Sequence, residues 1–197
     1  MSDDLEFRLD GLVERLRTAY DGIGHSSGRP YVYFVYPPTQ ERRLRRLVQD
    51  TLRSDAALCF HHIDLVPLTI RALAREEERR QALLERPQAG QAGEAADSIV
   101  RRWARALVRE IDKSLEHPES AGRPVVVLVG LAALHPLGNP TLLMERLAEQ
   151  EPRDPVTNKV LPVVLFVPGL RPPQTSRRYL FLGRAENDLV FYRGEEF

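Results

Sequence analysis

The segment Cys59-Phe-His-His-Ile-Asp64 holds the densest group of side chains that could bind a metal or transfer a proton. Cysteine, histidine and aspartate are common ligands of transition metals. The surrounding residues predict a strand, in which successive side chains point to opposite faces. Cys59 and His61 then share one face, whereas His62 and Asp64 share the other. We therefore expect no metal site here, and we expect Asp64 to cap a helix or a turn.

Arginine clusters are the second group with chemical potential. Arg42, Arg43, Arg45 and Arg46 lie on one predicted helix, and further arginines follow the fourth long strand. A solvated arginine surface and a surface that binds a phosphate or an acidic partner both fit this pattern. The residues predicted for partner or anion contact are Arg42, Arg46, Arg171, Arg177 and Arg178.

Motifs of nucleotide binding and nucleophilic catalysis are missing from the sequence. A P-loop would place glycines and a lysine after the first strand, where this chain has Tyr36-Pro-Pro-Thr-Gln-Glu41. There is no G-x-S-x-G nucleophile turn, and Cys59 is expected inside a strand, where a thiol is usually an inert packing group. The sequence thus predicts no catalytic residue, cofactor or metal.

Composition limits the class of protein. The chain has 197 residues with 43% hydrophobic content, which suits one domain with a sizeable core. Lysine plus arginine and aspartate plus glutamate both number 28, so no overall charge attracts the protein to nucleic acid or to a membrane. A single cysteine and the lack of an apolar leader lead us to expect a soluble cytoplasmic protein.

Apolar periodicity predicts alternating strands and helices. The predicted strands are 31–36, 58–65, 124–130, 161–167, 179–182 and 189–192, and the predicted helices are 4–20, 39–53, 67–86, 97–116 and 140–150. This alternation predicts an α/β fold, a single three-layer domain over residues 1–197 with a mostly parallel central sheet flanked by helices and without a P-loop. Residues 87–96, rich in alanine, glycine and glutamine, are predicted to form a mobile loop.

Three stretches, taken together, carry a family resemblance. They are Val125–Leu147, Leu161–Gly169, and Tyr179-Leu-Phe-Leu182 with Asp188 and Phe191-Tyr-Arg193. In this order and spacing they resemble the BrxB-like family of bacteriophage exclusion (BREX) systems, and Phe34–Pro38 with Glu41 is similar to the first strand and helix of that family. The residues that match the family motifs are Gly130, Pro136, Pro168, Gly169, Tyr192 and Arg193.

These motif residues have expected structural roles. We expect Gly130 and Gly169 to make sharp exits from strands, and Pro136 and Pro168 to stiffen the following loops. Tyr192 and Arg193 are expected to pin the last strand, or else to contact a partner. The segment Gly194-Glu-Glu-Phe197 and the loop near residue 90 depart from the family pattern.

The resemblance implies a non-catalytic adaptor or scaffold in DNA modification and phage exclusion. The partners it implies are an alkaline-phosphatase-like protein, a large AAA-type ATPase and an adenine-specific DNA methyltransferase. Two alternatives stay open. One is a degenerate nucleotide-binding or phosphoester hydrolase-like enzyme, and the other is an accessory module that binds DNA directly through the arginines of 42–46 and 171–178.

Overall fold

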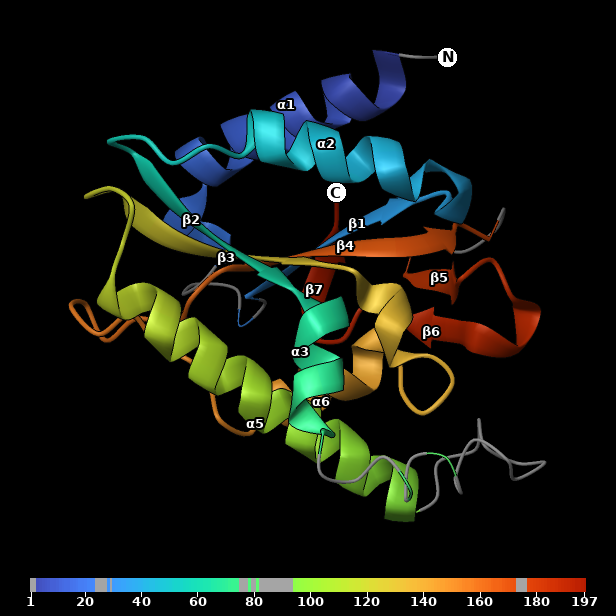
Figure 1. Cartoon of the computed structure of the whole chain (residues 1–197). Coiled ribbons are helices and arrows are strands. Elements are labelled where there is room, and N and C mark those ends of the chain that lie inside the picture. The colour runs from blue at the N-terminus through green and yellow to red at the C-terminus, as the bar shows by residue number, and fades with distance from the viewer. Residues whose placement is uncertain are drawn as a thin grey trace.

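The chain folds around one central sheet with helices on both faces (Figure 1). The structure is a computed structural model, and it describes residues 3–23, 28, 30–74, 78, 81, 94–172 and 177–197. The strands are β1 (Tyr31–Tyr36), β2 (Leu58–Asp64), β3 (Arg123–Val129), β4 (Val163–Leu170), β5 (Arg178–Phe181), β6 (Asp188–Val190) and β7 (Gly194–Glu196). The α-helices are α1 (Asp3–Thr18), α2 (Glu41–Thr51), α3 (Leu65–Ala72), α5 (Glu94–Glu116) and α6 (Pro140–Ala148).

The sheet is mostly parallel, which confirms the predicted fold class. Its strand order is β2-β3-β4-β1-β7, and these five strands pair in parallel. The end of β4 pairs with β5 in an antiparallel manner, and β5 pairs with β6 in the same way. The connection from β1 to β2 therefore passes over β4 and β3, and it contains α2.

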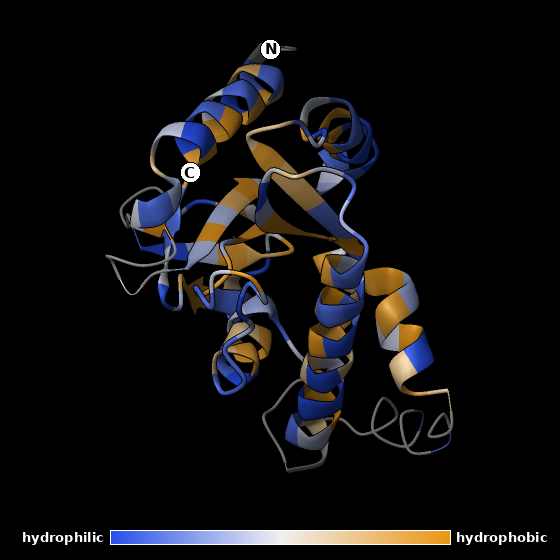
Figure 2. Ribbon diagram, turned by 90° about the vertical axis from the view of Figure 1, so that its left-hand side faces the viewer, coloured by the Kyte–Doolittle hydropathy of each residue, from blue (hydrophilic) through white to orange (hydrophobic). Residues whose placement is uncertain are grey.

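Each face of the sheet has its own core. Helices α1 and α2 pack on the face that carries Val32, Phe34 and Tyr36 of β1. Helices α3, α5 and α6 cover the other face, where Tyr31 and Tyr33 lie. All six residues of β1 are buried, because neighbouring strands flank it and helices cover both faces. In Figure 2 the central strands are mostly hydrophobic, and the helices around them carry both hydrophobic and hydrophilic residues.

Strand β7 was not predicted. It lies at the edge of the sheet, parallel to β1, with Tyr31 paired to Gly194 and Tyr33 paired to Glu196. Arg15 forms an ion pair with Glu195, and Arg171 forms one with Glu196. The Arg8 guanidinium donates a hydrogen bond of 2.9 Å to the main-chain oxygen of Phe197. Contacts with distant arginines thus hold a strand that has no apolar pattern of its own.

The starts of α2, α3 and α5 differ from the prediction. Helix α3 begins at Leu65 and not at 67, because Asp64 ends β2 and caps the helix. Thr39 does not cap α2, because Pro38–Gln40 first make a 3₁₀ turn and Gln40 precedes the helix without a side-chain cap. Helix α5 begins at Glu94 and not at 97, so the last residues of the predicted loop 87–96 are helical. Residues 87–93, and most of the predicted helix beyond Leu73, lie outside the described residues. Within the described part, no helix is long and apolar enough to cross a bilayer.

Candidate functional site

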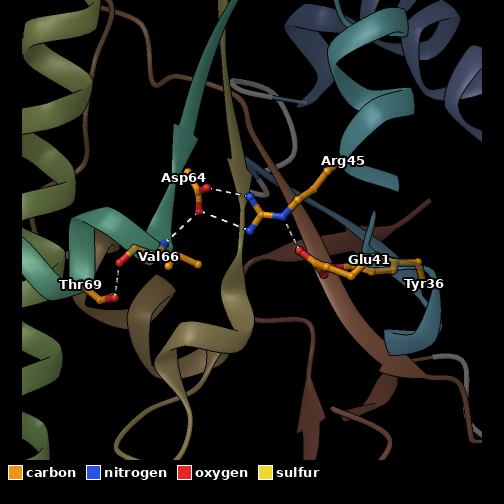
Figure 3. A network of polar contacts seen from close by, with 6 residues as sticks. All are labelled: Tyr36, Glu41, Arg45, Asp64, Val66 and Thr69. Carbon is orange, nitrogen blue, oxygen red and sulfur yellow. Dashed lines mark hydrogen bonds and ion pairs between the residues drawn. The ribbon is translucent and has the colours of Figure 1, made fainter. Parts of the chain in front are cut away.

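A network of polar side chains joins α2 to the carboxyl ends of the strands (Figure 3). The guanidinium of Arg45 donates from Nη1 to Asp64 Oδ2 at 2.7 Å and from Nη2 to Asp64 Oδ1 at 3.4 Å. Its Nε donates to Glu41 Oε1 at 2.7 Å, and the Tyr36 hydroxyl donates to the other oxygen of Glu41. One arginine thus links the exits of β1 and β2.

Local sequence places each member of this network. Tyr36 ends β1 because Pro37 and Pro38 follow it and cannot continue the ladder. Glu41 and Arg45 are four residues apart, so both side chains lie on one face of α2. Asp64 ends β2 and accepts the Val66 N–H at 2.9 Å, so it caps α3. The expected capping role of Asp64 is confirmed, whereas its bond to Arg45 was not predicted.

Gly130 lies against the ion pair of Arg45 and Asp64. It follows β3 with φ of 73°, in the left-handed region that favours glycine. A Cβ atom at this position would lie 2.4 Å from Asp64 Oδ1 and 2.7 Å from an Nη of Arg45. The ion pair therefore occupies the space that any other residue would need for its side chain.

Electrostatics hold the network in one charge state. Burial acts to raise the pKa of Asp64, but the hydrogen bonds from Arg45 and from the Val66 amide outweigh it, and this pKa falls below its ordinary value. The hydrogen bond to Asp64 is the main reason that the pKa of Arg45 is raised. Burial, followed by the hydrogen bond to Glu41, raises the pKa of Tyr36. At neutral pH, Asp64 is thus ionised, Arg45 is charged and Tyr36 keeps its proton.

An open groove of about 620 Å³ lies beside the network, between α2 and β2. Its apolar lining is Val48, Leu52 and Val129, and its polar lining is Arg45, Gln49, Arg53, Ser54, His62, Asp64 and Glu119. The imidazole Nε2 of His62 lies 2.8 Å from the main-chain oxygen of Leu52, so the ring connects β2 to the end of α2. We call this space the β2 groove.

The two histidines of the metal-like segment lie on opposite faces of the sheet. His61 is 6% exposed, and its surroundings include Ser114 of α5. His62 is exposed on the face of α2. The described residues contain no group of three or more histidine, cysteine, aspartate or glutamate side chains that could hold a metal ion.

The arginines predicted for partner contact fall into two groups. Arg171 bonds Glu196 and the Phe197 main chain, and Arg178 donates to Asp188 at 2.8 Å. Both therefore contribute to the packing of the chain itself. Arg42, Arg46 and Arg177 are exposed, and none of them makes an ion pair or side-chain hydrogen bond within the described part. These three remain accessible to a partner.

Gly130 and Pro136 lie at the exit of β3 and in the following loop, as expected, whereas Pro168 and Gly169 take different positions from those expected. Pro168 and Gly169 lie inside β4 and not in a loop after it, because Gly169 and Leu170 pair with β5. A Cβ atom on Gly169 would lie 2.8 Å from the Leu180 main-chain oxygen, so this glycine permits the close approach of β5. Pro136 follows His135 through a cis peptide bond in the loop before α6.

Tyr192 and Arg193 lie between β6 and β7. The Tyr33 hydroxyl donates to the main-chain oxygen of Tyr192 at 3.2 Å. Arg193 has φ of 43°, and its guanidinium lies 3.9 Å from Glu151. These contacts position residues 192 and 193 so that the next residues, which form β7, lie beside β1.

Comparison of the chain with protein-family models, with curated proteins and with solved structures finds no match.

Proposed function

We propose that this protein is a non-catalytic adaptor or scaffold in a BREX-type phage-defence complex. The family resemblance supplies this setting and its partners, which are an alkaline-phosphatase-like protein, a large AAA-type ATPase and an adenine-specific DNA methyltransferase. The complex would modify DNA and exclude phage in the cytoplasm.

One observation in the structure carries the adaptor role. At the carboxyl edge, where an α/β enzyme places its reactive groups, Tyr36, Glu41, Arg45 and Asp64 bond one another. A general acid or base must instead reach a substrate atom. Here the carboxylates fix Arg45, and Asp64 also caps a helix. This arrangement suits a rigid surface better than a reaction centre.

Exposed arginines supply the contact groups of that surface. Arg42 and Arg46 lie one turn apart on the outer side of α2, and Arg177 precedes β5. A guanidinium can bind a carboxylate with two parallel hydrogen bonds, and arginine is enriched among residues that dominate interface energy. We therefore expect the partner to present acidic side chains.

Co-purification tests the proposal. The tagged chain is co-expressed with each of the three implied partners, and recovery is compared among the native chain, Arg42→Glu/Arg46→Glu and Arg105→Glu/Arg109→Glu. Arg105 and Arg109 are exposed arginines of α5, on the opposite face of the sheet, so this second double variant controls for the change of charge. The proposal expects loss of one partner and of phage resistance with Arg42→Glu/Arg46→Glu alone. Recovery of no partner by the native chain would overturn it.

The two alternatives have their own tests. A nucleotide-binding enzyme predicts submicromolar binding of ATP in titration calorimetry, which would overturn the adaptor role. A DNA-binding module predicts retardation of duplex DNA with a steep dependence on salt, because each neutralised phosphate releases counterions.

A further inference from the structure

The two edges of the sheet differ in how they are protected. Strand β7 forms one edge, and it is only three residues long and carries Glu195 and Glu196. Short length and charge are the usual means by which edge strands avoid unwanted pairing. Strand β2 forms the other edge with seven residues. The β2 edge is therefore the one with length available for another strand.

Among the described residues, the turn before β2 makes hydrogen bonds to the first half of this edge and not to the second. Asp55 binds both main-chain groups of Leu58, since its N–H donates to the Leu58 oxygen at 2.8 Å and its carboxylate accepts the Leu58 N–H at 2.9 Å. The Ser54 hydroxyl accepts the N–H of Phe60 at 2.9 Å. These bonds show that Leu58 and Phe60 direct their main-chain groups away from β3.

The second half of the edge borders the β2 groove. Main-chain groups of alternate residues along a strand point to the same side, so the N–H and C=O of His62 point outward like those of Phe60. His62 and Asp64 both line the groove, and α2 forms its opposite wall through Arg45, Gln49 and Arg53. A groove between an edge strand and a helix accepts an extended peptide that adds to the sheet.

Charge indicates the chemistry of the occupant. Residues 41–53, which make up α2 and the turn after it, contain five arginines and two acidic residues. In the groove itself, Arg53 pairs with Asp50, and the lining also includes the carboxylates of Asp64 and Glu119. The positive charge left for a ligand comes from Arg42 and Arg46, which are exposed on the same helix without a partner among the described residues. An extended segment with acidic side chains would complement this helix.

We propose that an extended acidic segment of a partner protein pairs with β2 at His62 and lies in the β2 groove against α2. The inference rests on the adaptor role proposed above and identifies the surface and the kind of segment. Pairing through main-chain groups explains how a groove without a deep apolar pocket could hold a partner, and the arginines would select for acidic side chains.

A peptide probe tests the pairing directly. The probe is a fluorescein-labelled peptide of about ten residues that alternates valine and glutamate, a pattern that favours an extended conformation with one acidic face. The control peptide replaces glutamate with lysine. We expect saturable binding of the acidic peptide by fluorescence anisotropy, and slower amide exchange at residues 60–64 in its presence.

Two substitutions at one position separate main-chain pairing from side-chain contact. His62→Pro removes the outward N–H, and proline is tolerated on an edge strand where that N–H faces solvent. His62→Ala removes the imidazole but keeps the N–H. We expect about tenfold weaker peptide binding for His62→Pro and nearly native binding for His62→Ala. Circular dichroism verifies the fold of both, and amide exchange on the native chain gives an answer if the proline variant unfolds.

Several outcomes would overturn the inference. No binding of the acidic peptide, equal binding of the lysine peptide, or binding without protection of residues 60–64 would each do so. Displacement of the peptide by duplex DNA with a steep salt dependence would assign the surface to DNA. If the native chain and His62→Pro recover a defence partner equally, the adaptor role survives and only the groove is excluded. If neither recovers a partner, the adaptor role itself fails.

Discussion

Position 130 requires glycine for two reasons. Its backbone is left-handed, and the ion pair of Arg45 and Asp64 fills the space that a side chain would need. Gly130→Ala would force a left-handed φ on alanine and push a methyl group toward Asp64 Oδ1. We expect the free energy of unfolding to fall by about 3 kcal/mol, since strain and a disturbed ion pair add. Gly22→Ala is the matched control, because a Cβ there would meet nothing within 4 Å. Equal loss of stability in urea unfolding for the two variants would contradict this account.

We expect His61 to make the stability of the fold dependent on pH in the mildly acidic range. Burial lowers the pKa of its imidazole below the ordinary 6.5, and this effect outweighs the opposing hydrogen bond with the main chain of Ser114. The unfolded chain then binds a proton more tightly than the folded chain does. The contribution of neutral His61 to the free energy of unfolding is therefore fully present above about pH 6.5, and it is lost as the pH falls below that value.

His61→Leu should make unfolding less sensitive to pH over this range. Urea unfolding at about pH 7.5 and about pH 5.5 measures the difference. Paired carboxylates such as Asp64 lose their contribution only at lower pH, because the Asp64 pKa lies below 3.8. Burial, followed by Arg184, also lowers the pKa of His135, so His135→Gln is the companion variant. An unaltered pH dependence in His61→Leu would show that its burial has no energetic effect.

At the scale of elements, Arg45 and Asp64 fasten α2 to β2 and α3. Their side chains are about one third exposed, at 32% and 36%, so the pair is partly shielded from solvent. A double-mutant cycle with Arg45→Met and Asp64→Asn should give a coupling energy of about 1–2 kcal/mol, and asparagine can still cap α3. The exposed pair Arg53–Asp50, at 72% and 67%, is the control, with an expected coupling below about 0.5 kcal/mol.

Strand β7 depends on charged contacts in a comparable way. Arg171→Ala removes the partner of Glu196, a side chain that is only 17% exposed. We expect faster amide exchange at residues 194–197 and a loss of about 1 kcal/mol in stability. Arg177→Ala, at an exposed arginine without a partner within the described part, should change neither. If both variants behave alike, Arg171 does not hold β7.

At the scale of the whole molecule, buried strands were the most predictable feature. The apolar runs of β1, β3 and β4 predict strands that are covered on both faces. The alternation of these strands with helices predicts the α/β fold class. β7 escaped prediction because its three residues include two glutamates, and the groups that stabilise it, β1 and the arginines Arg15 and Arg171, are distant in sequence. The capping role of Asp64 could be inferred from its place at the end of β2. Its bond to Arg45 could not, because that contact depends on where α2 crosses the sheet.

The position of β1 has a consequence for how the protein is made. Both strands that pair with β1 consist of residues numbered 163 or higher. During synthesis from the amino end, β1 leaves the ribosome long before either neighbour exists. Its four aromatic and two valine side chains would then stay without sheet partners while most of the chain is translated, which favours late, slow closure and exposure to aggregation or chaperones.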